Sequence, residues 1–165
     1  MKTVKFIVLA VILVLSQLVN AQSGSDKMYD AFSNKDGVTN FTFTKNMTDA
    51  FNIDLGDDDD EKNVTGDLHQ IRFMAYNPKK GELSGSEFTK RAVKLLPSKY
   101  KMYVDDEDDS DAEIWLLGGK KKFTECHVFL TNQEENQMRF VVSFYGDFTV
   151  NDLDGLKKAG RGFSE

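Results

Sequence analysis

Two runs of neighbouring carboxylates are the residues of this chain with the clearest potential for chemistry. The first run is DDDDE, Asp57 to Glu61, and the second is DDEDDSD, Asp105 to Asp111. Carboxylate oxygens are the ligands that hard cations such as calcium take, often in loose geometry. The candidate ligands are Asp57, Asp58, Asp59, Asp60 and Glu61 in the first run, and Asp105, Asp106, Asp108, Asp109 and Asp111 in the second.

The spacing of both runs excludes the EF-hand calcium loop. That loop needs Gly at its sixth position for a sharp turn and a bidentate Glu at its twelfth. Counted from Asp57, these positions hold Lys62 and Leu68, and the same count from the start of the second run finds Ser110 and Leu116. The leading interpretation is therefore two solvated loops that keep the chain soluble. Weak calcium binding, or contact with a basic partner, is the alternative.

Other catalytic and metal-binding patterns find no support in the sequence. Cys126 and His127 are adjacent in a predicted strand, so their side chains point to opposite faces and cannot share a metal ion. Cys126 follows the apolar alternation and is expected to be a buried thiol. The G-x-S-x-G motif of serine hydrolases is absent. We expect no catalytic residues and no cofactor. A hydrolase whose acids converge only in the fold is the alternative, and a carboxylate beside His69 or His127 would favour it.

The first 21 residues have the pattern of a secretory signal peptide. Lys2 and Lys5 precede an apolar stretch from Phe6 to Val19, and Asn20-Ala21 provides a cleavage site. The apolar stretch is shorter than the roughly 20 residues of a membrane span, and no Cys lies nearby for lipid attachment. We therefore expect export to the periplasm or beyond, no membrane span after cleavage, and a single mature domain over residues 22–165.

The charge of the chain is divided between its body and the two acidic runs. The chain holds 21 basic and 27 acidic residues, a net charge of −6, and loss of Lys2 and Lys5 with the signal makes the mature charge −8. Thirteen of the acids lie within 54–61 and 105–113, so the remainder carries a net charge of +5. Nucleic acid is not expected as a partner of an exported chain with this balance. The single Cys excludes an intramolecular disulfide.

Apolar spacings of three and four residues predict four short helices. The first follows Ser25, a potential N-cap, and the third follows a capping box formed by Ser84 and Glu87. The other two are expected around Met47 to Phe51 and from Asn151 to Gly160.

Alternation of apolar and polar residues predicts six strands, with a hairpin at Gly118-Gly119. The expected strands are 38–44, 71–76, 100–104, 113–117, 124–131 and 138–144. The first part of the chain alternates helices and strands, and the later part groups four strands together. This order indicates an α+β fold, with a mainly antiparallel sheet of about six strands and helices packed on one face. The acidic runs then lie in loops near 54–66 and 105–113.

Several motifs in this order resemble a family of Bacteroidota envelope proteins, domain of unknown function 4252. They are KDGVTNFTFTKNM, LHQIRFMAYN, the helix ending in KLL, GGKKKFTECHVFL and SFYGDFTVNDLDGL. The resemblance implies a Gram-negative periplasmic or outer-envelope protein, and it implies no catalytic residues. Together with the residue patterns it favours a non-enzymatic protein that binds another envelope protein or macromolecule, or assists in sensing. The sequence does not specify the oligomeric state.

Solvation of the acidic runs predicts that calcium leaves stability unchanged. We expect the wild-type protein to melt at the same temperature with and without millimolar calcium, because neither run has the ligand spacing of an EF-hand. Thermal denaturation with calcium and with EDTA provides the measurement. A rise in melting temperature that disappears when Asp57 to Glu61 or Asp105 to Asp111 are replaced by Asn and Gln would establish cation binding instead.

Overall fold

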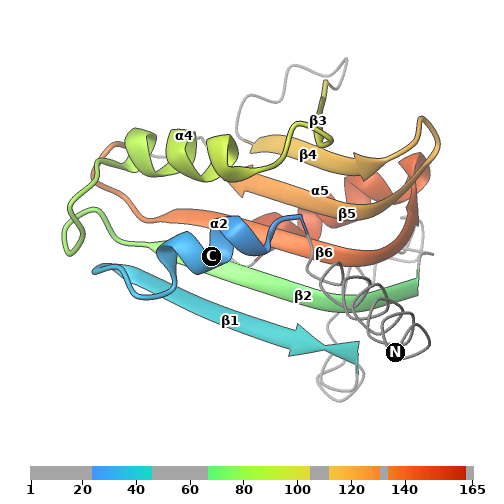
Figure 1. Ribbon diagram of the computed structural model, residues 1–165. Coiled ribbons are helices and arrows are strands. Elements are labelled where there is room, and N and C mark those ends of the chain that lie inside the picture. The colour runs from blue at the N-terminus through green and yellow to red at the C-terminus, as the bar shows by residue number, and fades with distance from the viewer. Residues whose placement is uncertain (1–23, 46–66, 105–111, 131–133, 163–165) are drawn as a thin grey trace, which may run out of the picture.

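Six strands in one antiparallel sheet form the centre of the computed structural model, which describes residues 24–45, 67–104, 112–130 and 134–162. The strands are β1 (Val38–Thr44), β2 (Asp67–Tyr76), β3 (Lys101–Tyr103), β4 (Ala112–Gly118), β5 (Lys122–Leu130) and β6 (Arg139–Thr149). The helices are α2 (Asp26–Phe32), α4 (Gly85–Leu95) and α5 (Leu153–Gly162), the last preceded by the 3₁₀ turn η2 (Val150–Asp152) (Figure 1).

The strand order in the sheet is β1-β2-β6-β5-β4-β3. β1 and β2 form a hairpin in which Phe41 lies opposite Phe73. β3 to β6 form a meander, and β6 returns to pair with β2. The last strand of the chain therefore lies in the interior of the sheet. The fold is α+β with six antiparallel strands, which confirms the fold class predicted from the sequence.

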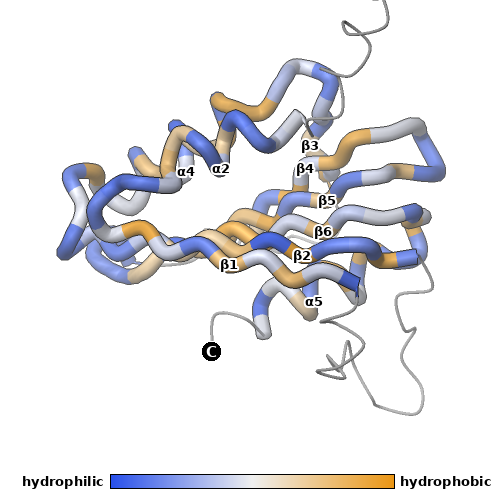
Figure 2. Tube along the Cα trace, turned by 60° about the horizontal axis from the view of Figure 1, so that its bottom comes forward, coloured by the Kyte–Doolittle hydropathy of each residue, from blue (hydrophilic) through white to orange (hydrophobic). Residues whose placement is uncertain are grey.

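The two faces of the sheet bury separate hydrophobic clusters. α2 and α4 cover one face, where Met28, Phe88 and Phe129 belong to the first cluster. α5 covers part of the opposite face, where Cys126, Val128 and Phe144 belong to the second. Figure 2 shows α2 and α4 on one side of the sheet and α5 on the other. The expectation of helices on a single face thus holds for α2 and α4 and is wrong for α5.

Helix α4 has the start that its sequence predicts. Ser84 Oγ accepts a hydrogen bond from the Glu87 N–H at 3.3 Å, and Glu87 Oε2 accepts one from the Ser84 N–H at 3.1 Å. This capping box satisfies two backbone donors at the helix start. The apolar side of α4, with Phe88 and Ala92 fully buried, then packs on the sheet.

One expected helix end is wrong, and one expected N-cap has the predicted position without the predicted side-chain hydrogen bond. Ser25 occupies the N-cap position of α2, but its side chain makes no capping bond and turns to Glu125 instead. Gly160 does not end α5, which continues to Gly162. A Cβ on Gly160 would lie 3.1 Å from Val128 Cγ1, so this glycine permits the close approach of α5 to β5. The helix expected around Met47 to Phe51 lies outside the described residues, as does the signal peptide.

Within the described ranges, no helix is long and apolar enough to cross a membrane.

Candidate functional site

A groove lies between α2 and α4 on the described surface. Its cavity volume is about 580 Å³. One wall comes from the C-terminal end of α2 and the turn after it. The other wall comes from the C-terminal half of α4, from Arg91 to Leu95. The floor comes from the end of β2 and the segment between β2 and α4. We call this feature the α2–α4 groove.

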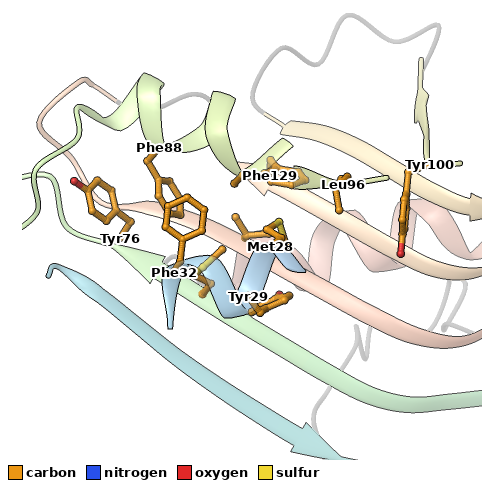
Figure 3. Close-up of a cluster of buried hydrophobic side chains, with 11 residues drawn as sticks. Met28, Tyr29, Phe32, Tyr76, Phe88, Leu96, Tyr100 and Phe129 are labelled. Carbon is orange, nitrogen blue, oxygen red and sulfur yellow. The ribbon is translucent and has the colours of Figure 1, made fainter. Parts of the chain in front are cut away.

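Stacked aromatic rings build the floor of the α2–α4 groove. The Tyr76 ring stacks on Phe88 with centroids 4.5 Å apart, and Phe32 meets Phe88 edge to face at 4.9 Å. Figure 3 shows these three rings between α2, α4 and β2. The Tyr76 hydroxyl donates to the Leu83 carbonyl oxygen at 2.6 Å and accepts from the Leu83 N–H at 2.8 Å. Because that hydroxyl is already satisfied, the floor offers apolar surface with few free polar groups.

Charged side chains surround the opening of the α2–α4 groove. The exposed cations are Lys35, Arg91 and Lys94, and the exposed anions are Asp36 and Glu82. None of these five side chains forms an ion pair within 4 Å of another described residue. The groove therefore combines an apolar floor with charges that are available to an occupant.

A second candidate site is a buried polar network beneath the start of α2. Ser143 on β6 lies directly opposite His127 on β5, and Ser143 Oγ is 2.7 Å from His127 Nδ1. The Tyr29 hydroxyl of α2 donates to Ser143 Oγ at 2.6 Å. Ser143 then donates to Nδ1, which assigns the remaining imidazole proton to Nε2. That nitrogen lies 3.4 Å from Glu125 Oε2, without the geometry of a hydrogen bond.

Glu125 is the acceptor on which the other half of the network converges. Tyr100 donates to Glu125 Oε2 at 2.7 Å, and Ser25 donates to the same oxygen at 3.2 Å. Tyr145 lies 2.8 Å from Ser25 Oγ and extends the chain of hydroxyl groups. Only 8% of the Glu125 surface is exposed. Hydroxyl donors from outside the sheet thus replace the water that the carboxylate loses on burial. A buried carboxylate needs such hydrogen-bond donors to be tolerated.

Burial governs the ionisation of this network. Desolvation lowers the pKa of His127 below its ordinary value of 6.5, and the neighbouring Glu125 carboxylate opposes that shift. Burial also raises the pKa values of Tyr29 and Tyr145. The Arg72 guanidinium lies 3.8 Å from the centre of the Tyr29 ring and pairs with Asp26 at 2.6 Å. The imidazole is therefore neutral at pH 7 and both phenols keep their protons.

The contacts run from the Glu125 carboxylate to the His127 imidazole to the Ser143 hydroxyl. A hydrolase triad has the same sequence of groups, in which a carboxylate orients an imidazole that activates a serine. Its surroundings differ from those of an active site, because His127 and Ser143 are both fully buried. A nucleophile must reach its substrate, and Tyr29 occupies the side of Ser143 that faces α2. In contrast, His69 and Asp67 lie 3.8 Å apart and are about half exposed, and Asp67 already pairs with Lys45 at 2.7 Å.

The acidic residues predicted as calcium ligands, in both runs, lie outside the described part of the chain. Among the residues that are described, no three His, Cys, Asp or Glu side chains are placed to hold a metal ion. Cys126 and His127 occupy opposite faces of β5, as predicted, and burial raises the pKa of the Cys126 thiol. The prediction that Cys126 is a buried thiol is confirmed.

Sequence reasoning missed both candidate sites. Glu125 and His127 are two residues apart in a strand and therefore share a face, which was a usable signal. Nothing in the alternation showed that this face is covered by helices. The α2–α4 groove had no signal of its own, because Arg91 and Lys94 look like ordinary solvent-facing residues of an amphipathic helix.

Protonation of the buried imidazole predicts a specific loss of stability in mild acid. The unfolded chain binds a proton at His127 below about pH 6.5 and the folded chain does not, so this group contributes stability that is present above that pH and is lost below it. We expect the free energy of unfolding to fall by up to about 1.4 kcal/mol per pH unit from this cause. Denaturant unfolding at pH 7.5, 6.5 and 5.5 measures it.

The matched control for this prediction is His69, which is half exposed. His127→Asn should flatten the pH dependence between pH 6.5 and 5.5, whereas His69→Asn should preserve the wild-type slope. Equal slopes in the wild type and in His127→Asn would show that the imidazole is accessible to protons in the folded state.

Comparisons with known proteins place the chain in a family. The 18 kDa heat shock protein of Clostridium acetobutylicum is 25% identical over 123 residues, which cover 65% of this chain and 80% of that protein. No solved structure gives a significant match. The family model described as Domain of unknown function (DUF4252) matches residues 29–156, from α2 into α5, and so includes all six strands. As the sequence motifs predicted, this chain belongs to the DUF4252 family.

Proposed function

We propose that this protein is an exported, non-enzymatic binding protein of the cell envelope. Its ligand is a segment of another envelope macromolecule that presents apolar side chains next to a carboxylate, and the α2–α4 groove holds that segment. The observation that carries the proposal is the groove itself. Its volume of about 580 Å³ falls within the range of sites that enclose a ligand or a short peptide segment.

The floor of the groove favours an apolar occupant. Phe32, Tyr76 and Leu95 line it, and the Tyr76 hydroxyl is already bonded to Leu83. Phe32 and Tyr76 are only 5% and 2% exposed, so the apolar surface open to an occupant comes mainly from half-buried lining residues such as Leu95. Burial of such surface contributes about 25 cal/mol per Å².

The rim of the groove favours a carboxylate beside that apolar group. Arg91 and Lys94 lie three residues apart on α4, so both side chains project on the same side of the helix. The guanidinium of Arg91 can bind a carboxylate in a bidentate manner. Asp36 and Glu82 add negative charge to the same rim and give the occupant a preferred orientation.

Export is supported by the first 21 residues, which combine a basic start, a short apolar stretch and a cleavage site. An exported domain of this family in a Gram-negative cell of the Bacteroidota, as the motifs imply, meets envelope proteins rather than nucleic acid. This location supplies the class of partner that the groove would bind.

Charge reversal on α4 tests the proposal. We expect Arg91→Glu with Lys94→Glu to lower partner recovery at least about tenfold, the factor that corresponds to 1.4 kcal/mol. The measurement is quantitative crosslinking and affinity purification from the envelope of the producing cell.

The matched control is Lys120→Glu with Lys121→Glu, an equal change of charge in the exposed turn between β4 and β5. This control should recover the same partner as the wild type, and both double variants should melt at the wild-type temperature. Equal loss in both variants would indicate a general electrostatic effect, and equal retention would exclude the groove.

A second candidate function, a hydrolase, is favoured by the contact chain from Glu125 through His127 to Ser143. For this activity α2 would have to move away from the sheet to expose Ser143. A fluorophosphonate probe, which reacts with activated serines, distinguishes the two functions. The binding protein predicts no labelling of the folded wild type. Labelling that is lost in Ser143→Ala but retained in Ser25→Ala would establish the hydrolase.

A further inference from the structure

Strand β1 is an edge of the sheet that the described residues form. It is the first strand in the order, and no other strand among the described residues pairs with its outer side. Its sequence VTNFTFT contains no charge and no Pro. The opposite edge, β3, has only three residues and begins with Lys101, which are features that discourage pairing with another chain. The two edges of this sheet are thus built differently.

The hydrogen-bond pattern shows which backbone groups of β1 face outward. The Asn77 N–H donates to the Gly37 carbonyl oxygen at 2.8 Å, so Gly37 and Asn77 form a hydrogen-bonded pair. Residues of an antiparallel pair alternate between bonded and non-bonded positions, and the register of β1 with β2 has no shift. The odd-numbered residues of β1 therefore bond to β2, and Asn40, Thr42 and Thr44 direct their N–H and C=O groups to the outer edge. The Val38 N–H is used in the preceding turn, where it donates to the Lys35 carbonyl oxygen at 3.1 Å.

This outward pattern is complementary to itself. When a second β1 approaches antiparallel about a twofold axis at Phe41, Val38 lies opposite Thr44 of the second copy and Asn40 lies opposite Thr42. Asn40 and Thr42 then form a hydrogen-bonded pair on each side of the axis, and the Thr44 N–H can donate to the Val38 carbonyl oxygen of the other copy. Phe41 meets Phe41 of the second copy at a non-bonded position, where side chains are closest.

The aromatic side chains suit the same arrangement. Phe41 is 53% exposed, and its ring lies 6.3 Å from Phe73, which in turn lies 5.7 Å from Phe140. Pairing of two copies would join these rows into one continuous aromatic row on the face that α5 covers only in part.

We propose that two copies of this chain associate through β1 into a twofold dimer with a continuous sheet. The dimer is independent of the α2–α4 groove, whose lining residues lie outside Val38–Thr44. Its occupant is a second copy because the outward backbone groups at Asn40 and Thr42 and the central Phe41 all match under one twofold rotation.

Charge exchange at the twofold axis tests the dimer, because Phe41 faces its own copy. Wild-type protein should sediment as two chains at micromolar concentration. Phe41→Lys and Phe41→Glu should each sediment as one chain, since like charges meet at the axis. An equimolar mixture of the two variants should recover the mass of two chains. Met102→Lys, an equally exposed residue on the other edge with 51% exposure, should leave the dimer unchanged.

A cysteine pair tests the register. Non-bonded antiparallel positions place Cα atoms about 4.5 Å apart, within the range that a disulfide spans. Phe41→Cys should therefore crosslink two chains under mild oxidation, and Thr39→Cys on the same face should not. Cys126 is buried and does not compete. A monomeric wild type, or a Phe41→Lys variant that dimerises like the wild type, would overturn the proposal.

Discussion

Glu125 imposes the constraint on which the arrangement of the first helix depends. It lies in β5 on the same face as His127 and Phe129, so the alternation that buries Phe129 also buries a carboxylate and an imidazole. Removing such groups from water is unfavourable unless donors replace the lost water. β5 and β6 do not provide enough of them. Ser25 and Tyr100 supply the hydroxyl groups, and they can do so only if the start of α2 and the segment after α4 lie over β5.

The same constraint explains where the surface is left open. α2 is held at its start by Ser25 and Tyr29, both bonded to groups of the sheet or its neighbours. Toward its end it is held by apolar packing, in which Phe32 meets Phe88 edge to face. The α2–α4 groove opens at that second end, where no polar contact draws the two helices together. The buried network thus lies at the start of α2, and the open groove lies at its end.

Local patterns of the sequence were enough to predict the elements whose signals are local. The capping box of α4 and the seven residues of β1 are as expected, because both depend on residues close in the chain. The face on which α5 packs was not predictable, since an amphipathic pattern states that a helix has an apolar side and not which layer it meets. The role of Ser25 failed for a related reason. A distant carboxylate competed for its hydroxyl group and displaced the local cap.

The candidate sites were beyond the sequence because both are assembled from separated elements. His127 and Ser143 become neighbours only through the register of β5 with β6. Tyr76, Phe88 and Phe32 come from three elements and meet only when α2 and α4 share one face. Their residue types gave no warning, since isolated tyrosines, lysines and arginines occur throughout the chain.

The interior position of β6 has a consequence for how the chain acquires its structure. A ribosome synthesises β1 and β2 early and β3 to β5 later, yet these two groups of strands share no ladder until β6 inserts between them. Nascent chains that end before residue 139 hold two separate half-sheets with unpaired inner edges. Contacts of such long sequence separation make folding slow. The cooperative unit therefore forms only after nearly the whole chain has been made.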